Sequence, residues 1–158
     1  MKNTFKRSGA VLISLVLLLV LAVSAGAASS QNVGVKFWKE RSDKESMANS
    51  GIDPDRTATL TRQANGTYTL TLPVMQVSKL GVTGYLSGLT IGDVTYDGTL
   101  TGDFNKATAV LTIKNLPASV LTGSDVNKSV LVTCNIQMDL QVLGEINTSA
   151  RMCIWNQK

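Results

Sequence analysis

Hydrophobic and polar residues alternate with a period of two along most of the chain after residue 31, which predicts β-strands. Residues 57–64 and 67–74 show the clearest alternation, and Asn65 and Gly66 lie between them. Both turn residues tolerate positive φ, so we predict a hairpin closed by a two-residue type I′ turn. Because Pro73 has no N–H, that end of the second strand should lie at an edge or leave the ladder.

Further alternating segments surround this hairpin. They predict additional strands over residues 32–38, 82–103, 107–113, 128–142 and 148–155. Glycines divide residues 82–103 into short pieces, and Asp97-Gly98 has the composition of a second hairpin turn. Turn signals recur about every ten residues and no long helical period is present, so we expect roughly seven to nine short strands.

Strands with one apolar and one polar face are typical of antiparallel sheets that contact water on one side. Packing the apolar faces together favours an all-β fold, an antiparallel β-sandwich. Residues 39–50 are charged and polar, and they can hold one short helical turn around Met47. The predicted fold is therefore a single sandwich domain with one short helical turn.

The first 27 residues have the layout of a secretory signal peptide. Basic residues open the segment, an apolar run covers residues 10–23, and residues 25–27 are small. The apolar run is short for a membrane span of about 20 residues, which favours a cleaved signal over an uncleaved anchor. We expect cleavage after Ala27, a mature domain over residues 28–158 without a membrane span, and a secreted or cell-surface location.

Charge and composition look different once this segment is set aside. The whole chain has 15 Lys and Arg, 11 Asp and Glu and a net charge of +4, but residues 28–158 carry 12 basic against 11 acidic residues. No Lys/Arg cluster remains, so we expect no nucleic-acid partner. The chain has no histidine, which excludes Ser-His-Asp and Cys-His catalysis and histidine metal sites. No nucleophile elbow or paired carboxylate replaces them, so we expect a binding protein rather than an enzyme.

Two cysteines, Cys134 and Cys153, lie in the last two predicted strands. Export and an even count favour a disulfide between them. Strand parity argues against it, because Cys134 shares the apolar face of its strand whereas Cys153 falls between Met152 and Ile154, on the opposite face. A bulge or twist would reconcile the two, so both a disulfide and two separate thiols remain open.

Three features follow one another along the chain after the predicted cleavage site. They are a lead strand ending in Phe37-Trp38, a polar stretch carrying Ser46-Met47-Ala48, and the hairpin over residues 57–74 with Asn-Gly-x-Tyr at its turn. This order resembles the NEAT (near-iron-transporter) domain of Gram-positive secreted and surface proteins, which shows a similar helical turn and hairpin. The later strands match in length and order, so the resemblance covers residues 32–155.

The resemblance implies an immunoglobulin-like β-sandwich with a haem site between the helical turn and the final hairpin. Ser46 occupies the position whose hydroxyl would hydrogen-bond a haem propionate, and Met47 is placed to cover a porphyrin face. Haem-binding members ligate iron through a tyrosine on the last strand, but residues 144–155 contain no tyrosine. Met152 on that strand offers a softer thioether ligand, as does Met138, although core packing is the commoner role of a methionine.

Two classes of function follow. The first is a secreted or cell-surface haem-binding or haem-relay module with a non-standard or missing axial ligand, whose partner is haem or a haem-carrying protein. The second is a haem-free binding module that contacts another surface protein or cell-surface component. The missing tyrosines favour the second and the usual role of the resembled family favours the first, which is the working hypothesis.

Overall fold

The computed structural model describes residues 28–79, 81–139 and 144–158, so the predicted signal peptide lies outside the described residues. The strands in these ranges are β1 (Ser29–Lys39), β2 (Ala58–Arg62), β3 (Tyr68–Pro73), β4 (Val77–Lys79), β5 (Val82–Ile91), β6 (Val94–Thr101), β7 (Val110–Leu116), β8 (Val130–Met138) and β9 (Glu145–Asn156). The 3₁₀ helices are η1 (Met47–Gly51), η2 (Phe104–Lys106), η3 (Ala118–Val120) and η4 (Val126–Lys128). Within the same ranges, no helix has the length and hydropathy to cross a membrane.

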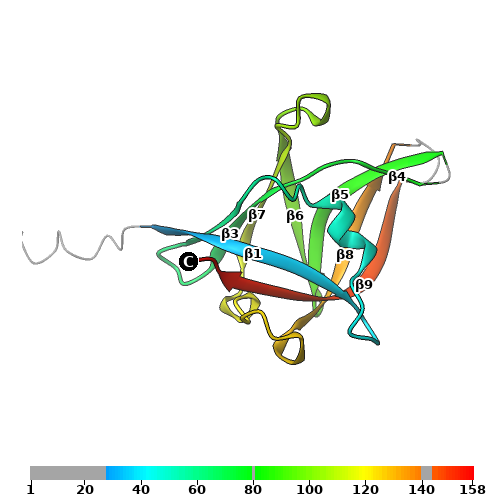
Figure 1. Ribbon diagram of the computed structural model, residues 1–158. Helices are drawn as coiled ribbons and strands as arrows, with labels where there is room; N and C mark the ends of the chain where they lie inside the picture. The colour runs from blue at the N-terminus through cyan, green and yellow to red at the C-terminus, as the bar shows by residue number, and fades with distance from the viewer. Residues whose placement is uncertain (1–27, 80, 140–143) are drawn as a thin grey trace, which may run out of the picture.

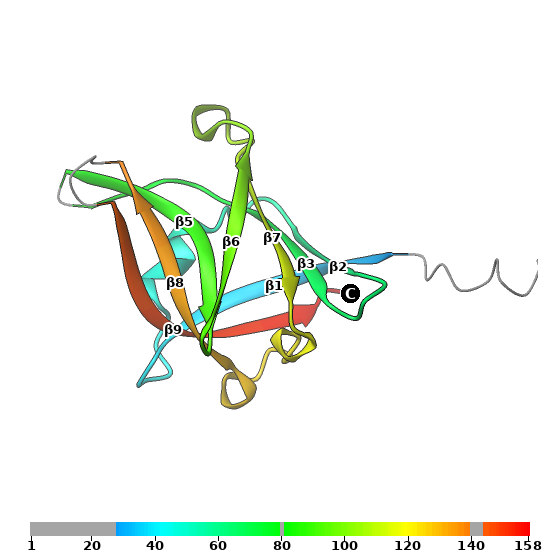
Figure 2. The same cartoon turned by 180° about the vertical axis from the view of Figure 1, so that it is seen from behind.

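The strands form one antiparallel sheet in the order β4-β5-β6-β7-β3-β2-β1-β9-β8. An additional ladder between β5 and β8 joins the two ends, so eight strands close into a barrel and β4 is attached outside the ring. Figure 1 shows β1 and β9 side by side along one wall, and Figure 2 shows the opposite wall of β8, β5, β6 and β7. The all-β antiparallel fold is confirmed, but a closed barrel replaces the expected two-layer sandwich because hydrogen bonding continues from β8 into β5.

The barrel encloses a single apolar core. Its largest fully buried side chains come from all around the ring: Val33, Phe37, Leu60, Leu70, Leu72, Val74, Leu89, Leu111, Ile113, Leu116, Met152 and Ile154. Inner positions alternate with outer ones along each strand, as the period-two pattern requires. The apolar face predicted for residues 128–142 points inward over the described part of β8, where Val132 and Cys134 join the core.

The two predicted hairpin turns are built differently from the expectation. The β2–β3 connection is a three-residue loop, because the Gln63 N–H donates to the Thr67 carbonyl at 2.8 Å and the Gly66 N–H donates to the Gln63 carbonyl at 3.0 Å. Gly66 has a φ of 83°, whereas Asn65 is not among the described non-glycine residues with positive φ. A type I′ turn needs positive φ at both central residues, so the loop instead has the pattern of a turn followed by a glycine bulge.

Asp97-Gly98 is not a turn. Both residues lie inside β6. The β5–β6 hairpin instead turns at residues 92 and 93, because Ile91 pairs directly with Val94. Gly98 is a glycine for a packing reason, since a Cβ at this position would collide with the Leu111 side chain of β7. The glycine signal was read as a turn where it marks a close approach of two strands.

The two cysteines are free and buried, and the strand register keeps them apart. Cys134 pairs with Thr148, five residues before Cys153 on β9, an offset of about 16 Å along an extended strand. Cys134 lies in the core, whereas the Cys153 thiol donates to the Asp125 carbonyl at 3.5 Å on the other side of the sheet. A disulfide needs Cα atoms roughly 4.4–6.8 Å apart, so the possible Cys134–Cys153 bond is not formed.

Titration with a thiol reagent is expected to find no reactive thiol in the native protein and two per chain after unfolding without reductant. Burial raises the pKa of the Cys134 thiol to about 12, so the nucleophilic thiolate is absent near neutral pH. Cys153 is protected by its complete burial. Finding no thiol in the unfolded, unreduced chain would contradict the register argument.

Candidate ligand-binding groove

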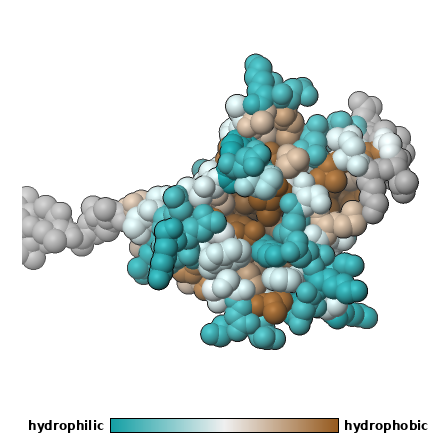
Figure 3. Space-filling view, viewed as in Figure 1, coloured by the Kyte–Doolittle hydropathy of each residue, from teal (hydrophilic) through white to brown (hydrophobic). Residues whose placement is uncertain are grey.

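An apolar groove with a volume of about 260 Å³ opens between η1 and one end of the barrel. We call it the groove, and its lining residues are Met47, Ala48, Gly51, Val77, Val82, Gly84, Tyr85, Leu86, Ile136, Met138, Ile146 and Thr148. Figure 3 shows apolar residues gathered in the middle of this face, bordered by polar ones. Ligand pockets are typically concave and mostly apolar with a few polar groups, and the groove has that character.

The floor of the groove continues the inner face of the barrel. On β8, Ile136 and Met138 follow Cys134 at the inward-facing positions, and the register places Ile136 beside Leu86 of β5 and Ile146 of β9. Ile136 and Met138 are only partly buried, whereas Cys134 is fully buried. The same apolar stripe that fills the core therefore emerges at this end of the barrel and lines the groove.

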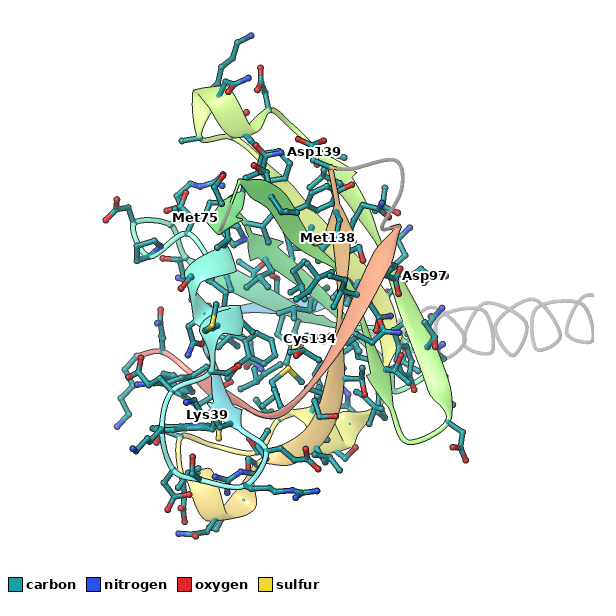
Figure 4. The ribbon with its side chains drawn as sticks, turned by 90° about the vertical axis from the view of Figure 1, so that its right-hand side faces the viewer. Lys39, Met75, Asp97, Cys134, Met138 and Asp139 are labelled. Atoms are coloured by element: carbon teal, nitrogen blue, oxygen red, sulfur yellow. The ribbon has the colours of Figure 1, made fainter. Side chains whose placement is uncertain are left out.

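Gly84 allows the Met138 side chain to approach the β5 backbone on one side of the floor. It pairs directly with Met138, and a Cβ added to Gly84 would lie 2.8 Å from the Met138 Sδ atom and 3.3 Å from Ile136 Cγ2. The missing side chain allows the sulfur to rest against the β5 backbone. Figure 4 shows Met138 on β8 where that strand runs beside β9.

Hydrogen bonds from β1 hold η1 over the groove. The Asn49 Oδ1 atom accepts from the Phe37 N–H at 2.8 Å, and its Nδ2 donates to the Phe37 carbonyl at 2.7 Å. Ser46 caps the first turn, because its hydroxyl accepts from the Ala48 N–H at 3.3 Å. The Ser46 N–H also donates to the Phe37 carbonyl, so both ends of this short turn are tied to one residue of β1.

The segment after η1 is anchored to the other wall. The Met75 N–H donates to the Gly51 carbonyl at 3.0 Å and the Asp53 N–H donates to the Pro73 carbonyl at 3.1 Å. Asp53 is nearly buried and accepts from the Arg56 guanidinium at 2.8 Å. That hydrogen bond, with a second from the Asp55 N–H, holds the pKa of Asp53 below its ordinary value. Together with the bonds to β1, these contacts hold η1 in place over the groove.

The candidate residues from the sequence divide between the groove and the core. Met47 lines the groove, and Ser46 caps the turn directly before it. Met152 is fully buried in the core, where it pairs with Phe37 on β1 and Val130 on β8, so it does not reach the groove. The expected contact between Met152 and a haem is therefore replaced by core packing.

Sequence reasoning missed three residues of this site. Met138 was assigned mainly to packing, Gly84 was read only as punctuation, and Asn49 was not singled out. A glycine inside an alternating strand signals a close backbone approach, which could have drawn attention to Gly84. Nothing local distinguishes Asn49, because its partners lie 12 residues away on β1.

Tyr85 of β5 also lines the groove, although it lies far from the final hairpin in the sequence. Its ring packs against Phe104 of η2, with centroids 5.2 Å apart. Tyr85 pairs with Gln137, the residue before the inward-facing Met138, and so lies on the opposite face of the sheet from that methionine. Among the described residues no group of three or more His, Cys, Asp or Glu side chains is placed to hold a metal ion.

No protein-family model matches the sequence, and no curated protein matches it. Fourteen chains of solved structures match the fold. They include the NEAT5 domain of IsdX2, a B. anthracis hemophore, in complex with haem, and a point mutant of that domain, also in complex with haem. Each is 10% identical, has a TM-score of 0.53 and covers 83% of this chain and 98% of its own. The chain therefore has a NEAT-like fold, as its sequence features predicted.

Proposed function

We propose that the chain is an exported haem-binding module that holds the porphyrin in the groove between η1 and the β8–β9 hairpin. The observation that carries this proposal is the position of the groove, because the resemblance to NEAT domains implies a haem site between the helical turn and the final hairpin. Solved structures with the same fold contain haem, which supports the proposal independently.

The lining residues fit a porphyrin. Aliphatic side chains from three strands form the floor, and Met47 and Ala48 of η1 form the cover, so both faces of a flat apolar ring would lose contact with water. The groove volume of about 260 Å³ is just below the range of roughly 300–1,000 Å³ typical of ligand pockets. A haem would therefore project from the mouth, which keeps its two carboxylates in water.

Ser46, which directly precedes the lining residue Met47, is the polar group that the resemblance implies for a propionate. Its oxygen accepts from the Ala48 N–H, and a serine hydroxyl has a hydrogen left to donate while it accepts. The haem iron, when bound, supplies a Lewis-acidic centre that takes axial ligands from the protein. Histidine is absent from the chain and the described part of the final hairpin has no tyrosine, so we propose that the axial ligand is non-standard or missing.

The same proposal includes the location of the protein. We propose that it is exported as a mature domain over residues 28–158 and lies outside the cell or in the cell wall of a Gram-positive bacterium. The layout of the first 27 residues supports export. The B. anthracis hemophore with the same fold supports the Gram-positive setting. We assign the module a binding role with no catalytic residues, because the groove lacks a general base or an activated nucleophile among its described lining residues.

A haem-free module that contacts a surface protein is the second candidate. The observation that favours it is the exposure of apolar residues at the groove mouth, where Met47 is 56% and Ile146 is 43% exposed. Exposed apolar patches mark protein-interaction sites as well as ligand grooves. A haem-relay module would bind haem in the groove and contact a partner protein at the groove mouth. A haem-carrying protein as partner is therefore compatible with the first candidate.

Titrating the purified mature protein with haemin is expected to produce a saturable Soret band at one haem per chain. Thr148→Glu should weaken this binding by roughly tenfold or more, about 1.4 kcal/mol, because the new carboxylate would be desolvated against the porphyrin. Thr148 is exposed and lines the groove, so the fold should tolerate the change.

Ser149→Glu is the matched control. Ser149 is also exposed on the same strand, but it pairs with Thr133 on the outer face. Its binding curve should equal that of the wild type. A wild-type protein without a saturable Soret change would overturn the haem proposal and leave the protein-binding candidate.

A further inference from the structure

We infer that a second cavity, distinct from the groove, binds the carboxamide or lactam edge of a small neutral aromatic ligand. The cavity has a volume of about 220 Å³ and is lined in part by Val35, Asp53, Asp55, Arg56, Trp155 and Gln157. We call it the edge pocket, because one edge of β1 forms part of its wall. Its described lining residues all differ from those of the groove, so the inference is independent of haem binding.

Val35 has a backbone N–H and carbonyl that the barrel leaves unpaired. On one side of it along this edge of β1, Val33 pairs with Ala58 of β2. On the other side, the Asn49 side chain bonds both the N–H and the carbonyl of Phe37. Backbone groups two residues apart in a strand point to the same edge, so those of Val35 point away from β9 and lie between these two contacts. Within the described residues neither group has a hydrogen-bond partner.

The contact between Asn49 and Phe37 shows which group fits such a pair. The Asn49 carboxamide presents its oxygen to the Phe37 N–H at 2.8 Å and its Nδ2 to the Phe37 carbonyl at 2.7 Å, so one planar group satisfies both. A ligand with a carbonyl and an N–H on the same side can make the same two bonds to Val35. Primary carboxamides and lactam rings have this arrangement.

A peptide is a poorer match for this edge. A single trans peptide group has its carbonyl and N–H on opposite sides, so it can make only one of the two bonds. An added peptide strand would need further free backbone groups on either side of Val35. Those of Val33 and Phe37 already face β2 and Asn49.

The Trp155 indole supplies an apolar surface beside the same edge. Trp155 of β9 pairs with Gly34, and a Cβ added to Gly34 would collide with the indole. The glycine therefore lets the ring lie across β1, next to Val35. Because the ring is half-buried and lines the edge pocket, it can stack with an aromatic ligand whose amide edge is bonded to Val35.

The charged side chains of the edge pocket select a neutral ligand. The lining has two carboxylates, Asp53 and Asp55, and one guanidinium, Arg56, so its formal charge is negative. Asp53 accepts from Arg56 at 2.8 Å, which leaves the exposed Asp55 carboxylate to repel an anion. A ligand carboxylate would also lack the N–H that the Val35 carbonyl needs.

The test titrates the mature protein with nicotinamide, followed by calorimetry and by the NMR shift of the Val35 amide proton. Nicotinamide is a single aromatic ring with a primary carboxamide, and the edge pocket, at about 220 Å³, is below the range of roughly 300–1,000 Å³ typical of larger ligands. Nicotinic acid is the anionic analogue, and N,N-dimethylnicotinamide lacks the N–H. We expect saturable binding of nicotinamide with a downfield shift of the Val35 amide proton, and roughly tenfold or weaker binding of both analogues.

Two control variants accompany the substitution of the indole. Trp155→Leu should weaken nicotinamide binding by roughly fivefold or more, because it removes the stacking surface. Trp38→Leu is the matched control, since Trp38 is also half-buried and lies on β1 but does not line the edge pocket. Thr148→Glu changes only the groove. Both control variants should bind nicotinamide as tightly as the wild type.

The ligand series on the wild type decides the inference without any substitution. Equal affinity for nicotinamide and its dimethyl analogue, or a Val35 amide proton that does not move, would overturn it. Saturable binding of glucose in the absence of nicotinamide binding would also overturn it and identify a sugar site instead. The haemin titration is a separate measurement, so failure of either proposal leaves the other standing.

Discussion

Met152→Ala is expected to lower the free energy of unfolding by about 2–5 kcal/mol, the usual range for truncating a fully buried methionine. Met152 is completely buried between Phe37 of β1 and Val130 of β8, so alanine leaves a cavity in the middle of the barrel. Urea denaturation followed by tryptophan fluorescence measures the change. An effect below about 0.5 kcal/mol would place this side chain outside the core.

Met152→Leu serves as the paired variant for this prediction. Because leucine nearly conserves volume, the loss of stability should stay below about 1.5 kcal/mol. The variant also removes the sulfur that was a candidate iron ligand from the sequence. Its haem spectrum should equal that of the wild type, whereas an altered Soret band would return Met152 to the ligand site.

Asn49→Ala is expected to destabilise the protein by about 2 kcal/mol and to weaken haem binding by roughly tenfold or more. The substitution removes both hydrogen bonds from Asn49 to Phe37, which leaves the buried Phe37 N–H without this acceptor, while the Phe37 carbonyl keeps the Ser46 N–H. It also leaves η1 tied to β1 only at Ser46, so the cover of the groove is held less firmly. Denaturation in urea and haemin titration measure the two effects.

Two further variants interpret the Asn49 result. Ser50→Ala changes an exposed residue of the same helix and should alter neither stability nor binding by a measurable amount. Asn49→Asp keeps the acceptor for the Phe37 N–H and loses the donor to its carbonyl, so it should fall between wild type and alanine. Equal haem affinity in Asn49→Ala and wild type would show that η1 does not need this anchor to cover the groove.

Most strands could be predicted because their alternation is a local property. The segments 57–64, 67–74 and 148–155 overlap β2, β3 and β9, and the longest alternation overlaps β8. Turns were less accurate, as the glycine at position 98 illustrates. Glycine is required both where φ is positive and where a neighbouring strand approaches, and the local sequence does not distinguish these two causes.

The closure of the barrel depended on contacts between distant segments. The ladder between β5 and β8 joins residues about fifty positions apart, including Leu86 with Ile136. A period-two pattern states which residues share a face but not which strands pair across the sheet. The expected sandwich and the observed barrel satisfy the same pattern, so only the tertiary structure could separate them.

The candidate site shows the same division. Residues 46–48 were identified from the sequence as a possible helical turn in a polar stretch, and the resemblance to NEAT domains gave Ser46 and Met47 their place at the site. Met138 and Met152 both occupy inward-facing positions, and their local patterns are alike. Met152 lies between two strands in the middle of the barrel, whereas Met138 lies at the end of β8 against a glycine.

The sequence alone therefore determined which side chains point inward and where the helical turn falls. The tertiary structure decided which of those inward-facing side chains are buried in the core and which line the groove. The physical reason is that burial depends on position along the barrel axis, which is set by how strands from distant parts of the chain are staggered. Neither hydrophobicity nor spacing along one strand contains that information.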